Sequence, residues 1–144
     1  MIDILPGLRS TSSALTAERV RMDVISHNIA HANTTTRDAQ GDVYQRRQVL
    51  FETLLQETSN RFTGGSQLEK PIASRVVIEH RPPRLVHNPD HPDADANGNV
   101  AYPDINIHEE MVELISASRA FEANLAVMKH ARNMAIQTLS IGKR

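Results

Sequence analysis

Four oxygen-bearing residues near the middle of the chain have the spacing of a calcium-binding loop. They are Asp93, Asp95, Asn97 and Asp104. Hard cations prefer carboxylate and amide oxygens, and Gly98 occupies the position where such loops turn sharply. The last ligand, however, is an aspartate where the pattern has the longer glutamate, and nearby prolines exclude the helix that precedes an EF-hand loop. A turn whose Asx side chains bond their own backbone is the simpler interpretation, and a calcium-binding interaction module remains the alternative.

The other candidates for chemistry are weaker. His27 and His31 are four residues apart, as metal ligands on one helical face often are, but no third ligand is identifiable and the glutamate of zinc-hydrolase helices is missing. A packed or exposed histidine pair is therefore the better interpretation. Arg46 and Arg47, with Arg37 nearby, could hold an acidic partner. The interleaved aromatic residues and the overall basicity of a nucleic-acid surface are missing, so we expect solvated strand residues.

Composition excludes several function classes. The 144 residues include no cysteine, which removes disulfides, thiol nucleophiles and zinc–thiolate sites. The net charge is −1, so no basic field indicates nucleic acid. We find no nucleophile elbow and no glycine-rich phosphate loop, and we expect neither catalysis nor a cofactor. The start lacks the features of a cleaved signal peptide, and no apolar run approaches the ~18–20 residues that span a bilayer, so we expect no membrane insertion.

The apolar pattern predicts a long C-terminal helix over residues 106–142. Large apolar residues return to one side every seven positions, the spacing of a seam between helices. The residues that we assign to packing between subunits there are Met111, Leu114, Phe121, Leu125, Met128 and Leu139. A second stripe beside it, including Ala117 and Val127, makes the apolar face wider than two helices need. Asn106 is the expected N-cap and Glu109 its capping partner. At about 1.5 Å per residue, a continuous helix would be roughly 52 Å long and would need partners.

A second helix with its own stripe is expected at the other end of the chain. Its packing residues are Leu8, Leu15, Met22, Ile25 and Ile29. Pro6 and Gly7 weaken the first turn, so the helix is expected to begin between Leu8 and Ser13. Asn33 is the expected left-handed C-cap residue. Because the two terminal helices have matching patterns, we expect them to pack on each other as well as on other subunits.

The residues between the helices have strand and turn patterns instead of the seven-residue helical period. Asp42–Glu52 has an extended pattern, and Ser74–Glu79 predicts a strand. Asn97-Gly98 is a strong turn signal and predicts a hairpin between residues 85–86 and residues 100–102. The expected fold is mainly α, with long terminal helices over 1–33 and 106–144 and a small β-rich insert over 34–105.

Three segments resemble bacterial flagellar axial proteins. SHNIAHANTTTRD (Ser26–Asp38) resembles their SNIANANT signature, here carried by Asn28, Ala32, Asn33 and Thr34, with His27 and His31 as departures. GDVYQRRQVLFE (Gly41–Glu52) is similar to the proximal-rod members. Residues 88–143, from NPDHPDADANGN to TLSIGK, resemble the FlgC-type rod proteins in particular. The resemblance covers nearly the whole chain and leaves Thr53–Lys70 as a variable loop.

The resemblance implies a structural subunit of the flagellar basal-body rod, the shaft that crosses the periplasm. In that family the terminal helices form an antiparallel, coiled-coil-like pair in the inner layer, and the middle segment lies outside. It implies other rod subunits and copies of the chain as partners, with the MS-ring and the flagellar type III export apparatus at the base. That apparatus exports proteins that have no cleavable signal peptide. The lack of signal-peptide features at the start of this chain agrees with such export. A cytoplasmic coiled-coil adaptor would share the helices but differ in location.

Overall fold

The computed structural model describes residues 6–37, 41–53 and 72–142. Its elements in chain order are α1 (Pro6–His31), β1 (Arg47–Thr53), β2 (Ile72–Ile78), β3 (Arg84–His87), β4 (Asn99–Tyr102) and α2 (Ile107–Ile141). Most of the variable loop expected between Thr53 and Lys70 lies outside the described residues.

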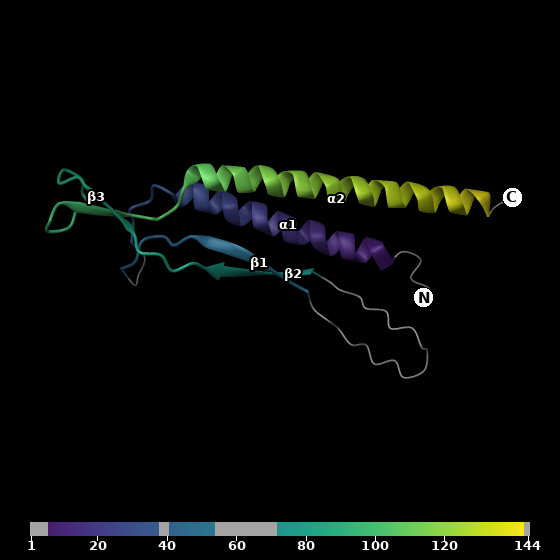
Figure 1. Cartoon of the computed structure of the whole chain (residues 1–144), viewed down its shortest axis with the longest axis horizontal. Helices are drawn as coiled ribbons and strands as arrows, with labels where there is room; N and C mark the ends of the chain where they lie inside the picture. The colour runs from purple at the N-terminus through teal and green to yellow at the C-terminus, as the bar shows by residue number, and fades with distance from the viewer. Residues whose placement is uncertain (1–5, 38–40, 54–71, 143–144) are drawn as a thin grey trace, which may run out of the picture.

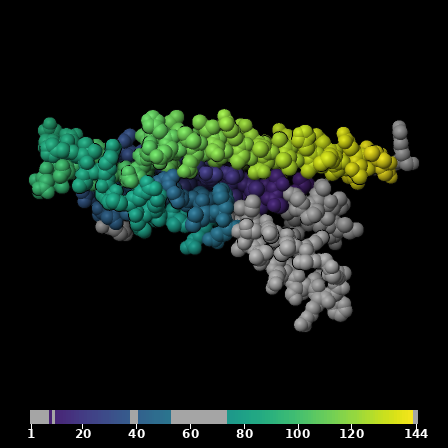
Figure 2. Space-filling model, in the orientation of Figure 1, coloured from purple at the N-terminus to yellow at the C-terminus, as the bar shows by residue number. Residues whose placement is uncertain are grey.

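The two long helices lie side by side and run in opposite directions (Figure 1). The start of α1 and the end of α2 share one end of the molecule. The β1–β2 ribbon lies along α1 on the side away from α2, and the β3–β4 hairpin extends past the other end of the helices. Figure 2 shows the same elongated outline, with α2 along one edge. The mainly α fold with a small antiparallel β segment is confirmed. No helix in the described part of the chain is long and apolar enough to cross a membrane.

Both ends of α1 differ from the expectation. The helix begins at Pro6 rather than between Leu8 and Ser13, because proline is tolerated in a first turn whose N–H groups have no intrahelical partner. It ends at His31, and the Thr34 N–H bonds the His31 carbonyl at 3.0 Å. Among the described residues only glycines have positive φ, so the left-handed cap expected at Asn33 is wrong.

α2 is one continuous helix of 35 residues. Asn106 caps it as expected, since its side-chain oxygen accepts a hydrogen bond from the His108 N–H at 3.1 Å. Glu109 completes the cap differently from a standard capping box. Its carboxylate accepts from the Asn106 side-chain amide at 3.0 Å instead of from the backbone.

The strands form two separate antiparallel pairs. In the ribbon, Arg47 pairs with Ile78 and Thr53 with Ile72. In the hairpin, Arg84 pairs with Tyr102 and His87 with Asn99, which confirms the hairpin predicted from Asn97-Gly98. Gly98 has φ of +75°, and a Cβ there would lie 3.0 Å from the His87 ring, so the turn needs glycine.

The buried core is small and concentrated where the helices begin to pair. Its apolar members are Ala17, Val24, Ile25, Ala32, Val100 and Ala117. Half of them are alanines. Three polar residues are buried in the same region, and they define the candidate site.

Candidate functional site: a polar junction and the open faces of the helix pair

Asn28 lies at the centre of a buried polar junction between α1, α2 and the β segments. Its side chain is 1% exposed. The amide nitrogen donates to the Arg47 carbonyl at 2.8 Å and to Glu110 Oε2 at 3.0 Å. The amide oxygen accepts from the Arg47 N–H and from the Tyr44 hydroxyl, both at 3.0 Å. Both amide protons and both lone pairs of Asn28 are therefore used. Glu110 lies in α2, Arg47 is the first residue of β1, and Tyr44 lies in the segment before β1.

Arg46 is the cation of this junction. Its guanidinium donates to Glu110 at 2.7 Å, to Glu79 at 3.0 Å and to Glu113 at 3.2 Å. Arg46 is buried, at 9% exposed, and Glu110 is 1% exposed. The expectation of a solvated strand residue is wrong for Arg46 and agrees with the exposed Arg47. A charge removed from water requires such partners, and the three carboxylates supply them.

The protonation states of the junction follow from these contacts. Burial alone would lower the pKa of Arg46, but hydrogen bonds to Glu110 and Glu79 outweigh it and raise the pKa. Hydrogen bonds from Arg81 and then from Arg46 lower the pKa of Glu79. Burial raises the pKa of Tyr44, which keeps its hydroxyl protonated as a donor to Asn28. These pKa shifts favour the charged forms of Arg46 and Glu79 and the neutral form of Tyr44.

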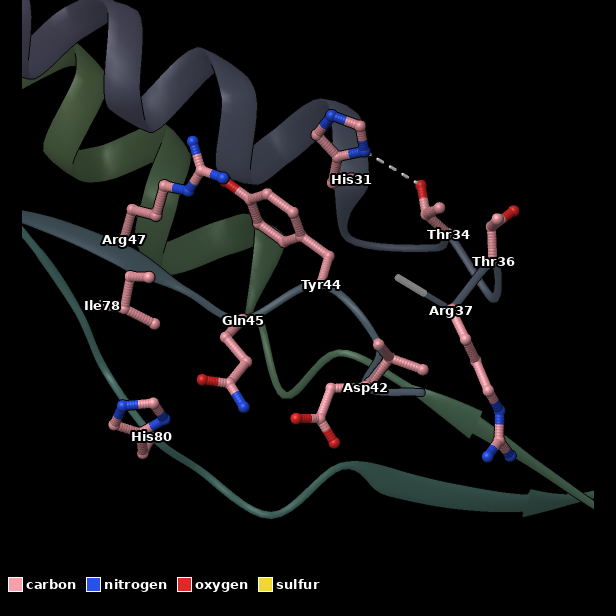
Figure 3. Close-up of a pocket in the computed structure, with 11 residues that line it drawn as sticks. His31, Thr34, Thr36, Arg37, Asp42, Tyr44, Gln45, Arg47, Ile78 and His80 are labelled. Carbon is pink, nitrogen blue, oxygen red and sulfur yellow. Dashed lines mark hydrogen bonds between the residues drawn. The ribbon is translucent and has the colours of Figure 1, made fainter. Parts of the chain in front are cut away.

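A pocket of about 450 Å³ opens beside the junction, between the end of α1 and residues 42–47 (Figure 3). The His31 and Tyr44 rings stack there with centroids 4.6 Å apart, and the Arg47 guanidinium lies 5.3 Å from the Tyr44 ring. His31 Nδ1 is 3.3 Å from the Thr34 hydroxyl. These contacts hold the chain that leaves α1 against the chain that enters β1.

The two histidines form a ring pair. His27 and His31 stack with centroids 6.4 Å apart. Over the residues that the structure describes, no three His, Asp or Glu side chains are grouped to hold a metal ion.

The candidate calcium ligands bond protein groups instead of converging. Asp93 accepts from the Thr35 hydroxyl at 2.7 Å. Asp95 accepts from the N–H groups of Asn97 and Asn99, each at 2.8 Å. Asp104 lies 3.7 Å from Arg81. The Asp95 contacts are those of an Asx turn, and no observation supports the calcium-binding alternative.

The residues predicted to pack between subunits differ in their exposure within one chain. Ile25 is buried. The half-buried ones are Leu8, Leu15, Met22, Ile29, Leu114, Phe121, Leu125 and Met128. Met111 is 50% exposed and Leu139 is 68% exposed. The neighbouring stripe is also split, since Ala117 is buried while Val127 is 55% exposed. One partner helix therefore covers only part of the apolar surface.

The four signature residues have separate roles. Asn28 anchors the junction, Ala32 is buried, Thr34 contacts His31, and Asn33 is exposed. The sequence analysis gave Asn28 no contacts and did not identify Glu110 as a buried partner. A signal was available for both: Asn28 falls between Ile25 and Ala32 in the buried stripe, and Glu110 precedes the buried Ala117 by seven residues.

Comparisons with known proteins agree at both ends of the chain. Residues 8–37 match the family model described as flagella basal body rod protein, and residues 96–141 match the model of the flagellar basal body rod FlgEFG protein C-terminal region. The chain is 34% identical to the flagellar basal-body rod protein FlgC of Bacillus subtilis, over 95% of this chain and 97% of that protein. It is 35% identical to FlgC of Salmonella typhimurium, over 91% and 92%. It is 34% identical to FlgC of Borreliella burgdorferi, over 96% and 97%. The chain belongs to the FlgC family of flagellar basal-body rod proteins.

Proposed function

We propose that the chain is a structural, non-enzymatic subunit of the flagellar basal-body rod that polymerises through the faces of its terminal helices. Its relatives are named as rod proteins, and the similarity extends over more than nine-tenths of the chain. The same family supports a location in the flagellar basal body.

The observation that carries the proposal is the exposed apolar surface of α2. Eight large apolar side chains of this helix are 50% to 76% exposed: Met111, Val112, Ile115, Val127, Met134, Ile136, Leu139 and Ile141. Full burial of one such side chain stabilises by about 1.5–3 kcal/mol. Scattered exposed apolar residues are ordinary, but so many on one helix favour a surface that other subunits cover.

The finer parts of the proposal follow the family resemblance. Residues 1–33 and 106–144 would form the inner layer of the rod, and residues 34–105 would form its outer part. The partners would be copies of the chain, other rod subunits, the MS-ring and the flagellar type III export apparatus. Export by that apparatus would bring the subunit to a rod that crosses the periplasm.

Purified hook–basal bodies test the proposal directly. Mass spectrometry of their digested protein should find this chain together with other rod components, and preparations from a strain lacking its gene are the control. Intact basal bodies without the chain would contradict the proposal. A calorimetric calcium titration, with Asp93→Ala/Asp95→Ala as the control variant, would then test the alternative.

A further inference from the structure

The charged residues of the junction continue outward as an alternating series that links the helix pair to both β segments. We call this series the charge ladder: Glu113 and Glu110, then Arg46, Glu79, Arg81 and Asp104. We propose that the charge ladder, rather than apolar packing, fixes the orientation of the β1–β2 ribbon against the helix pair, with Arg46 as the positioning residue. The inference concerns the fold of the single chain and does not depend on its entry into the rod.

The inner half of the ladder ties α2 to the ribbon. Glu110 and Glu113 lie in the first two turns of α2, while Arg46 directly precedes β1. Arg46 also binds Glu79, the residue after β2, twice: its guanidinium donates to the carboxylate, and its carbonyl accepts from the Glu79 N–H at 2.8 Å. A planar guanidinium holds its partners in fixed directions, so one side chain sets where both strands leave the helix pair.

The outer half of the ladder continues to the hairpin. Glu79 Oε1 accepts from two nitrogens of Arg81, at 2.7 and 2.8 Å. Arg81 also lies 3.7 Å from Asp104, in the segment that joins β4 to α2. Arg81 therefore bridges the chain that enters the hairpin and the chain that leaves it.

Apolar packing does not provide the same positioning for the ribbon. None of its side chains that the structure describes is buried. Leu50, Phe51, Val76 and Ile78 are between 43% and 48% exposed. The ribbon contacts α1 but makes no comparable contact with α2 within the described residues. A two-stranded ribbon is marginally stable alone, so it depends on its packing against α1 and on the directional contacts that Arg46 and Asn28 make at its base.

The buried pair within the ladder, Arg46 and Glu110, also suits positioning better than stabilisation. Burying an ion pair costs desolvation energy that the attraction barely offsets, whereas removing one partner leaves a buried charge without compensation. Buried ionic groups instead select one arrangement in several proteins, and here they would select one direction of the strands. Replacing one charged partner can therefore be compared with replacing both, which separates the effect on orientation from the effect on stability.

The test measures the distance between α1 and the ribbon in solution. The native sequence has no cysteine, so Arg19→Cys and Glu52→Cys give two exposed spin-label sites without further changes. Pulsed electron resonance should find a single narrow distance maximum in the otherwise native chain. Arg46→Met should lose that maximum while circular dichroism retains the helix signal. Arg75→Met is the matched control: it removes an exposed ribbon arginine outside the ladder and should leave the narrow maximum unchanged.

A double variant separates the two roles of the ladder. Arg46→Met should lower Tm by on the order of 10 °C, because Glu110 is left buried without its cation. Arg46→Met/Glu110→Met removes both charges and should recover most of this loss, yet its distance distribution should stay broad. A narrow maximum in the double variant would overturn the proposal, because apolar packing would then suffice. If Arg46→Met fails to fold, the double variant and Arg46→Lys decide: Arg46→Lys keeps the charge without the planar fork and should also broaden the distribution.

Discussion

The two halves of the helix pair are built differently. In the half next to the β segments, α1 buries Val24, Ile25 and Asn28, and α2 buries Glu110 and Ala117. In the other half, no described residue of α2 beyond Ala117 is buried; Phe121, Leu125 and Met128 are half-buried there, and five large apolar side chains are more than half exposed. We call the first half closed, because it holds every buried side chain of α2, and the second half open. Exposed apolar side chains occur in both, since Met111, Val112 and Ile115 are at least half exposed in the closed half.

The largest expected effect on the single chain is at the closed half. Glu110→Ala removes a buried anion that both Arg46 and Asn28 contact, and breaking such a buried pair costs about 3–5 kcal/mol. Urea unfolding of the purified chain measures the change. Glu122→Ala removes an exposed glutamate of the same helix and should change little. Equal effects of the two substitutions would remove the distinction between the halves.

In the open half, the largest effect should appear only on assembly. Leu125→Ala should cost about 2–5 kcal/mol if the half-buried side chain becomes buried in the rod. Swimming should be impaired more than by Lys129→Ala, which alters an exposed position four residues later. If both variants swim equally well, our assignment of the faces is wrong.

The cap of α2 should have an intermediate effect on the closed half. Asn106→Ala removes the acceptor for the His108 N–H and should cost about 0.5–2 kcal/mol. Asn106→Ser keeps a side-chain oxygen for this N–H without placing a second carboxylate beside Glu109, and serves as the control in the same urea experiment. A loss as large for Asn106→Ser as for Asn106→Ala would show that the cap oxygen is not responsible.

Acid should weaken the junction through Glu79. Because hydrogen bonds from Arg81 and Arg46 lower its pKa in the folded chain, its contribution is full above the ordinary value of 4.5 and is lost as the pH falls below it. The urea midpoint should therefore fall on acidification through this range, and Glu79→Gln should show a smaller fall. An unchanged fall in Glu79→Gln would assign the acid sensitivity to other carboxylates.

The smallest expected effect on the isolated chain is at the far end of α2. Leu139 is 68% exposed, so Leu139→Ala should change the free energy of unfolding by less than about 0.5 kcal/mol. The same variant should still impair swimming, because it removes apolar surface that assembly would cover. A strong loss of stability in the monomer would place Leu139 in the closed half instead.

The regular parts of the fold could be predicted from the sequence because their causes are local. Seven-residue periodicity identified both helices, and Asn97-Gly98 identified the hairpin. The start of α1 was misplaced because the cost of Pro6 was applied to a first turn, where proline loses no hydrogen bond.

The polar junction could not be predicted because its partners are far apart in the sequence. Asn28 and Glu110 are separated by 82 positions, and Arg46 and Glu110 by 64. Taken alone, an arginine before a strand favours solvent, and only the three surrounding glutamates reverse that preference. The position of Asn28 within the apolar stripe of α1 is a signal for a buried polar partner, but it does not identify that partner.

The placement of both helix termini at one end has a mechanical consequence (Figure 1). Tension applied between the start of α1 and the end of α2 would separate the helices turn by turn from that end, so that few contacts break at a time. Tension between that end and the hairpin would run along the helix axes and load the whole interface at once. The monomer should therefore be weak when peeled from its termini and strong when sheared along its length.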